Sequence, residues 1–417
     1  MSRAGLEVAD VFRAAGAKFL QTQRGFVSSE QLRVASDLVA CRTAALGGHV
    51  DGCNACGHRQ ISYNSCRNRH CPKCQGAARA SWLKARSSEL LPVPYFHLVF
   101  TLPEVLSPLA LQNPRVVYGI LFRAASQTLL EVAATPKHLG AKIGFLAVLH
   151  TWGQNLMHHP HLHLVVPAGG LSADESRWFP CRPGFFLPVR VLSRVFRGKF
   201  VALLRQAFQA GKLAFHGQLA PRAEPAAFEH LLNMAVRQDW VVYAKQPFGG
   251  PDVVLKYLAR YTHRVAIANQ RLISLQDGKV TFRWKDYACG QAQKTMTVSA
   301  GEFLRRFLLH VLPSGFVRIR HCGFMANRQR HEKLARCRAL LGVAGRDDSA
   351  TALAQPTAPS TLDRDCPSSA EKQPICPACK ADRLVRIDTL ERWPRPPFYR
   401  YRVKQPLRQA VPIRDTS

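Results

Sequence analysis

The sequence predicts an α+β protein: a largely antiparallel sheet flanked by helices, preceded by a helical, zinc-binding segment. Short apolar runs bounded by prolines alternate with helical patterns, Asp277-Gly278 separates two strand-like runs, and two Cys-x-x-Cys motifs stand near the N-terminus. Strands that alternate with helices and are joined by hairpins favour this class. We expect three parts: a zinc-binding part over residues 1–91, a sheet over residues 92–342, and a flexible linker with a basic tail over residues 343–417.

The N-terminal part begins with two helical patterns over residues 6–47. The second opens with Ser28 and Gln31, which have the spacing of a capping box, and it stops at Gly47 and Gly48. A cysteine-rich block and another helical pattern then continue to about Leu91.

The cysteine-rich block predicts a structural zinc site. A Cys-x-x-Cys turn presents two thiolates on one side of an ion, and two such turns complete the tetrahedral shell that zinc prefers. The predicted ligands are Cys53, Cys56, Cys71 and Cys74. Neighbouring side chains that could replace a ligand or hold a second ion are Cys41, His49, Cys66 and His70.

The charge of the chain indicates a nucleic-acid partner. Lys and Arg outnumber Asp and Glu by 58 to 27, which gives a formal net charge of +31 at pH 7. Such a surplus repels itself unless a polyanion is near, so we expect DNA binding, with Arg67, Arg69 and Lys73 as contacts in the cysteine block. We see no signal-peptide pattern and no apolar run near the ~18 residues of a membrane span. We therefore expect a cytoplasmic protein with no membrane partner.

Residues 92–342 carry the pattern of the sheet. Dense apolar runs favour buried strands, and longer stretches with a 3.6-residue period favour helices. The expected strands cover residues 95–102, 143–151, 161–166 and 240–244, with a hairpin over 271–275 and 279–284. The expected helices cover about residues 113–133, 190–210, 225–237, 302–312 and 325–342, and a further helix starts near Asp252.

Two histidines in one of these strands predict a metal site. Residues i and i+2 of a strand point to the same face, so His161 and His163 would direct two imidazoles at one point. Such a site needs a third polar ligand. We favour Gln154, whose amide oxygen suits Mg²⁺ or Mn²⁺, and His97 is the second candidate.

The helix expected from Asp252 would carry two tyrosines on one face. Tyr257 and Tyr261 are spaced i, i+4, which places their Cβ atoms roughly 6 Å apart. Each phenol is a candidate nucleophile if positive charge favours the phenolate. The residues that supply this charge and could hold phosphates are Lys256, Arg260, His263 and Arg264. The alternative is an amphipathic helix whose tyrosines pack on the sheet.

The last part has the composition of a linker followed by a basic tail. Residues 343–374 are rich in Ala, Ser, Thr, Pro and Asp. The tail contains Cys376-Pro-Ala-Cys379, which with Cys366 forms only half of a metal site.

Together these motifs resemble a known family, the bacterial two-tyrosine HUH transposases of the rolling-circle type (the insertion-sequence ninety-one group). The matching stretches are NSCRNRHCPKCQ, PYFHLVFTLP, HTWGQ with HPHLH, KYLARYTHR and RIRHCGFMANR, and the likeness covers most of residues 30–340. It implies an HUH-endonuclease-like sheet and an N-terminal zinc domain. It also implies His161 and His163 as metal ligands and Tyr257 and Tyr261 as nucleophiles.

The resemblance implies a transposase that nicks and rejoins single-stranded DNA through a 5′-phosphotyrosine. The reaction would use Mg²⁺ or Mn²⁺ and no nucleotide, and the chain has no GxxxxGK[ST] phosphate loop. Two alternatives stay open. A plasmid replication initiator or relaxase would use the same HUH chemistry, and a zinc-ribbon regulator would bind DNA without cutting it.

Overall fold

The computed structural model describes residues 5–248, 253, 265–286, 290, 292–342, 375–380 and 383–393. Backbone contacts divide the chain into two compact units. Of the described residues, the larger unit contains 5–39 and 68–342, and the smaller unit contains 40–67 and 375–393. The segment expected to carry Tyr257 and Tyr261 lies outside the described residues.

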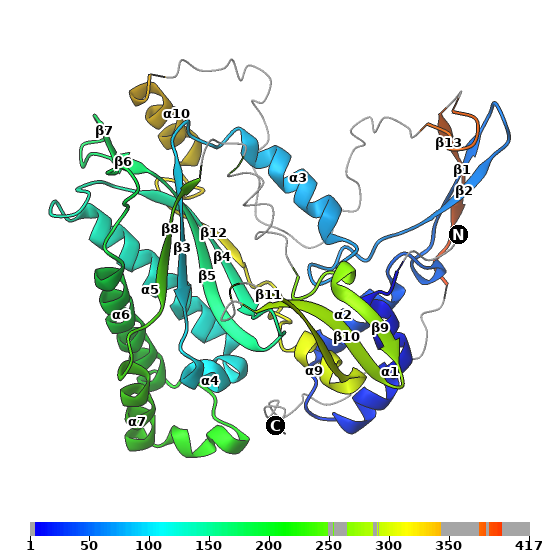
Figure 1. Cartoon of the computed structure of the whole chain (residues 1–417), viewed down its shortest axis with the longest axis horizontal. Coiled ribbons are helices and arrows are strands. Elements are labelled where there is room, and N and C mark those ends of the chain that lie inside the picture. Colours follow the sequence, from blue (N-terminus) through cyan, green and yellow to red (C-terminus); the bar gives the residue numbers. More distant parts are fainter. Residues whose placement is uncertain are drawn as a thin grey trace. The chain divides into compact units, whose positions relative to one another are not determined.

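A five-stranded antiparallel sheet stands at the centre of the larger unit, in the order β12-β4-β5-β3-β8 (Figure 1). Its strands are β3 (Tyr95–Thr101), β4 (Gly144–Trp152), β5 (His158–Pro167), β8 (Val242–Phe248) and β12 (Ile319–Gly323). The predicted α+β class is confirmed. Four of the strands overlap predicted ones, although β8 shares only residues 242–244 with the strand expected over 240–244. The fifth strand, β12, was not predicted, because it is a half-buried edge strand whose sequence contains basic residues and no apolar run.

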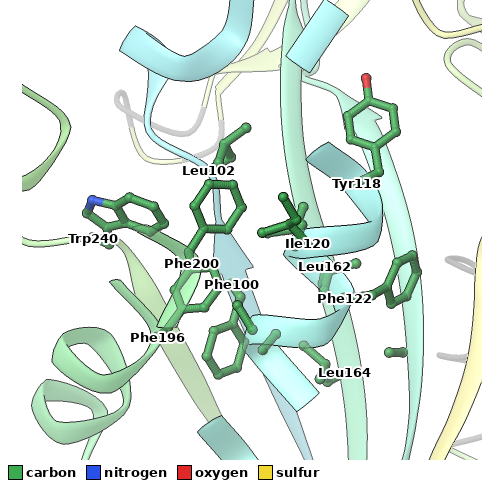
Figure 2. Packing of buried hydrophobic residues seen from close by; sticks show 14 of the residues in the cluster. Phe100, Leu102, Tyr118, Ile120, Phe122, Leu162, Leu164, Phe196, Phe200 and Trp240 are labelled. Carbon is green, nitrogen blue, oxygen red and sulfur yellow. The ribbon is translucent and has the colours of Figure 1, made fainter. Parts of the chain in front are cut away.

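Helices cover one face of this sheet (Figure 1). They are α4 (Ser107–Gln112), α5 (Pro114–Ala134), α6 (Val189–Gln209) and α7 (Pro225–Val236). Phe100, Leu162 and Leu164 of the sheet pack against Phe122 and Phe196 of the helices (Figure 2). Each such fully buried side chain contributes roughly 1.5–3 kcal/mol. This packing fixes which face of each strand points inward.

Helix α5 is long and apolar enough to cross a membrane, judged by length and composition alone. However, its Leu121, Ala125 and Leu129 are fully buried in the core beside the sheet. The apolar character of this helix is therefore explained by packing within the larger unit.

A second, three-stranded sheet has the order β11-β10-β9. Its strands are β9 (Leu272–Gln276), β10 (Lys279–Asp286) and β11 (Ala292–Ser299). At the turn between β9 and β10, Asp277 and Gly278 have φ angles of 49° and 68°. Two consecutive positive φ angles are what a type I′ hairpin turn requires. The predicted hairpin is confirmed.

The N-terminal helices α1 (Val8–Thr22) and α2 (Ser29–Ala40) pack with α9 (Ala300–Leu308). The rings of Phe12 and Phe307 meet edge to face at 5.8 Å. The predicted capping box at the start of α2 is present, since the backbone N–H of Ser28 donates to Gln31 Oε1 and that of Gln31 donates to Ser28 Oγ. The remaining elements of the larger unit include α3 (Gln75–Ser87), β6 (Gly169–Leu171), β7 (Trp178–Pro180) and α10 (Arg330–Leu340).

The smaller unit is built from segments far apart in the sequence. β1 (Gly48–Cys53) pairs with β2 (Arg59–Tyr63) on one side and with β13 (Leu384–Leu390) on the other, and both pairings are antiparallel. Residues 384–390 lie in the predicted basic tail, where no strand was expected. In the structure they form an edge strand, because β1 offers them a free row of backbone hydrogen-bonding groups.

Candidate metal centre and cysteine groups

Three histidines converge on the face of the central sheet that α5 and α6 do not cover. Leu162 points into the helical core, so its neighbours His161 and His163 point to the opposite face. His150 on β4 lies directly opposite His161 in the strand pairing. One ring nitrogen from each of the three imidazoles lies within 4.8 Å of the other two. The structure thus brings the predicted pair together and adds a third imidazole.

The contacts of the two Nδ1 atoms orient the Nε2 atoms of the pair for a metal ion. His161 Nδ1 is 2.7 Å from the carbonyl oxygen of His159, and His163 Nδ1 is 2.8 Å from His97 Nε2. If each Nδ1–H donates in these contacts, both Nε2 atoms carry a lone pair. The two Nε2 atoms are 3.1 Å apart. Two nitrogens bound to one ion at about 2.1 Å each would be about 3.0–3.4 Å apart, so the pair fits a shared ion.

His97 lies behind His163 as its hydrogen-bond partner. It was the second candidate for the third ligand, but the group of three converging imidazoles does not include it. Its side chain is only 5% exposed, and burial, followed by the charge of Lys245, lowers the pKa of His97 to about 3. A neutral imidazole can accept the Nδ1–H of His163, which fixes the tautomer and the ring orientation.

Replacing His97 should therefore weaken metal binding without removing a ligand. We expect His97→Ala to lower the affinity for Mn²⁺ about 10- to 100-fold, the usual cost of losing such a partner. His97→Gln keeps an acceptor oxygen and should retain affinity within a few-fold. Calorimetric titration of Mn²⁺ into each purified variant measures this difference. Equal losses in both variants would indicate that His97 serves packing alone.

His150 was not among the predicted ligands. The residue is 3% exposed and its ring stacks on Trp152, with ring centroids 4.6 Å apart. Its position in the strand expected over residues 143–151 was a usable signal. The register of β4 against β5, which places His150 beside His161, could not be predicted from the sequence.

Gln154, the favoured third ligand, lies in the turn between β4 and β5. Three consecutive carbonyls of this turn accept hydrogen bonds from other elements of the larger unit. Arg271 donates to Gln154 O, and Arg306 donates to Asn155 O. A ring nitrogen of His310 lies 3.0 Å from Leu156 O. The turn is thus held in place next to the histidines, and the role of the Gln154 side chain as a ligand stays a prediction.

Four cysteines of the smaller unit meet at one point. Cys53 and Cys56 meet Cys376 and Cys379, and all four sulfur atoms lie within 4.8 Å of one another. The predicted set of four ligands is therefore corrected, because Cys53 and Cys56 belong to this group, whereas Cys71 and Cys74 belong to the larger unit. The tertiary structure determines which thiols meet, so two motifs that are neighbours in the sequence need not bind the same ion.

Comparison with known proteins gives the family. One family model, described as a putative transposase, matches residues 144–333, and another, described as a transposase zinc-binding domain, matches residues 11–102. The chain is 54% identical over 398 residues to the putative transposase y4qJ of Sinorhizobium fredii (strain NBRC 101917 / NGR234), which covers 95% of this chain and 98% of that protein. The chain belongs to the IS91 family of transposases.

A more distant relative agrees with this assignment. The chain is 30% identical over 312 residues to the transposase for insertion sequence element IS801 of Pseudomonas savastanoi pv. phaseolicola, which covers 73% of each chain. No solved structure matches the chain. The predicted family with its N-terminal zinc-binding domain is confirmed, and the IS91 transposase is an enzyme that acts on DNA. The zinc-binding domain and the clustered cysteines support structural zinc.

The structure places three of the predicted DNA contacts of this transposase. Arg69 directs its guanidinium at the carbonyl oxygens of Phe316 and Pro313, and Lys73 Nζ is 2.9 Å from Glu7 Oε2. Both cations are therefore used within the fold, whereas Arg67 is exposed. The other predicted contacts, Lys256, Arg260, His263 and Arg264, lie outside the described residues.

Proposed function

We propose that this transposase nicks and rejoins single-stranded DNA at the ends of its insertion sequence, in transposition of the rolling-circle type. The observation that carries the proposal is the set of three imidazoles, with the Nε2 atoms of His161 and His163 separated by 3.1 Å. These ligands leave coordination positions open for a phosphate oxygen. A bound Mg²⁺ or Mn²⁺ would polarise the scissile phosphate and offset the charge that develops on it.

We assign the nucleophiles to Tyr257 and Tyr261. The phenolate oxygen of one tyrosine attacks phosphorus, so that a tyrosine–phosphorus bond forms while the bond from phosphorus to the 3′ oxygen breaks. The phenol proton is lost to solvent, and the leaving 3′ oxygen takes up a proton to become a hydroxyl. The resulting 5′-phosphotyrosine keeps the energy of the phosphodiester, so a 3′-hydroxyl can reverse the step without a nucleotide.

The distribution of charge supports a DNA substrate. The net charge of +31 attracts a polyanion over a broad surface. Lys256, Arg260, His263 and Arg264 stand next to the proposed nucleophiles in the sequence and would hold phosphates and favour the phenolate. The second tyrosine would hold another strand end while the first link is resolved. This work would take place on DNA in the cytoplasm.

The proposal predicts a covalent adduct that depends on a divalent ion. Purified protein incubated with single-stranded DNA from the element ends and Mn²⁺ should form a species that survives denaturant and carries the fragment on the 3′ side of the cut, joined through its 5′ phosphate. Removal of the catalytic ion by EDTA should suppress the adduct, and fresh Mn²⁺ should restore it. The EDTA treatment is kept brief so that structural zinc stays bound, and the zinc content is measured before and after it to check this. Binding without any cutting, across several metals and DNA forms, would instead support a non-catalytic regulator.

A further inference from the structure

We propose a structural zinc site formed by Cys53, Cys56, Cys376 and Cys379, which joins the N-terminal zinc module to a segment more than 300 residues later. Neither family match reaches this segment, since the matched regions are residues 11–102 and 144–333. All four ligands belong to the smaller unit.

The sulfur atoms have the spacing of a tetrahedral zinc site. Cys53 Sγ is 3.6 Å from Cys379 Sγ, and Cys56 Sγ is 3.7 Å from Cys376 Sγ. Four thiolates at about 2.3 Å from one ion are about 3.8 Å from each other. A disulfide would bring a sulfur pair to about 2.05 Å. The observed distances therefore fit an ion at the centre of the four sulfurs and not two disulfides.

The two Cys-x-x-Cys turns have the same backbone conformation. Gly57 N–H donates to Cys53 O at 2.9 Å, and Lys380 N–H donates to Cys376 O at 3.0 Å. Both residues after the turn have positive φ angles, 70° for Gly57 and 58° for Lys380. A lysine adopts this conformation only at a cost, so the surrounding structure must impose it. The first cysteine of each turn faces the second cysteine of the other, which is an approximately twofold arrangement around one point.

The C-terminal turn is built into the unit by its neighbours. β13 pairs with all six residues of β1, and Ile375 forms an antiparallel bridge with Arg383. A Cβ atom on Gly52 would lie 3.0 Å from the side chain of Ile387, so β13 packs closely over this part of β1. The thiols and the strand are thus parts of one assembly.

The core around this site is too small to hold the assembly by apolar burial. Its buried members are Cys53, Cys376 and Leu384, with Cys379 packed against them. Small units with so little core commonly need a metal ion or disulfides to fold. Zinc bound to the four thiolates would supply this stabilisation, and it would make residues 375–393 a functional part of the zinc module.

Zinc content of the full-length chain tests the site. Cys376→Ser/Cys379→Ser should contain one zinc ion per chain fewer than the unmodified protein, as measured by inductively coupled plasma mass spectrometry. The matched control is Cys181→Ser/Cys322→Ser, which removes two thiols that belong to no cluster of metal-ligand type among the described residues, and it should leave the zinc content unchanged. Cys379→His, which keeps a zinc ligand, should retain the ion. Unchanged zinc in Cys376→Ser/Cys379→Ser would overturn the site.

A second measurement does not depend on how the variants fold. The unmodified protein is treated with iodoacetamide before and after zinc removal, and its peptides are mapped by mass spectrometry. Cys56 is exposed, yet we expect Cys56, Cys376 and Cys379 to be alkylated only after zinc removal, because zinc-bound thiolates are protected. Free alkylation of these three cysteines while the protein retains all its zinc, or a disulfide between them, would refute the proposal.

Discussion

Replacement of His163 by alanine should lower the rate of DNA cleavage at least about 10³-fold, because a metal that polarises the phosphate supplies several kcal/mol of transition-state stabilisation and each ~1.4 kcal/mol is worth tenfold in rate. His161→Ala should have a similar effect, since the two Nε2 atoms face each other at 3.1 Å. His150→Ala should also impair cleavage, as one imidazole of the converging set is lost. Single-turnover cleavage of a labelled strand, at saturating Mn²⁺, gives these rates.

The control for this series is His230→Ala, which removes an exposed imidazole from α7 on the other side of the sheet. It should cleave at the rate of the unmodified protein. Thermal unfolding of every variant separates loss of the ion from loss of the fold. His161 and His163 are only partly buried, so their replacement should leave the unfolding temperature nearly unchanged. A His163→Ala variant that cleaves within tenfold of the unmodified rate would rule out the proposed metal centre.

The central sheet and the histidine pair were predictable because both depend on short-range alternation. In β5, the residues at every second position face the helical core, as Leu162 and Leu164 do. This alternation also determines that His161 and His163 share the opposite face. The type I′ turn was predictable for a similar reason, since Asp277-Gly278 readily adopts two positive φ angles.

Contacts between segments that are far apart in the chain could not be predicted from the sequence. Identifying His150 as a partner of His161 requires the register of β4 against β5, which includes an irregularity between His150 and Trp152. The pairing of Cys53 and Cys56 with Cys376 and Cys379 joins turns more than 300 residues apart. No local pattern reports such a contact. The nearer motif at Cys71 was a reasonable partner by sequence, but it belongs to the larger unit.

The amino-acid composition also could not show which basic residues form contacts within the fold. Net charge predicts that DNA is the partner, but it does not say which cations are free to contact phosphate. Arg69 is used to hold backbone carbonyls at residues 312–316, and Lys73 is paired with Glu7. A guanidinium or an ammonium in a basic motif is a DNA contact only if the fold leaves its donors unused.

Tyr257→Phe/Tyr261→Phe should abolish the covalent adduct, with a loss of at least about 10³-fold, because no other phenol is proposed to attack phosphorus. Phenylalanine keeps the ring and removes only the oxygen, so zinc content and the affinity for Mn²⁺ should stay unchanged. These two measurements separate loss of the nucleophile from loss of the metal centre. The double variant should still bind single-stranded DNA, because the basic residues beside both positions remain.

The single variants then separate the two tyrosines. If one phenol makes the first cut and the other receives a second strand end, one variant should lose the adduct on a substrate with one end. The other should form that adduct but fail to join two ends. The matched control is Tyr243→Phe, which removes the hydroxyl of a tyrosine exposed on β8, and it should leave both activities intact. An adduct that persists in Tyr257→Phe/Tyr261→Phe would place the nucleophile elsewhere in the chain, and peptide mapping of the DNA-linked residue would then locate it.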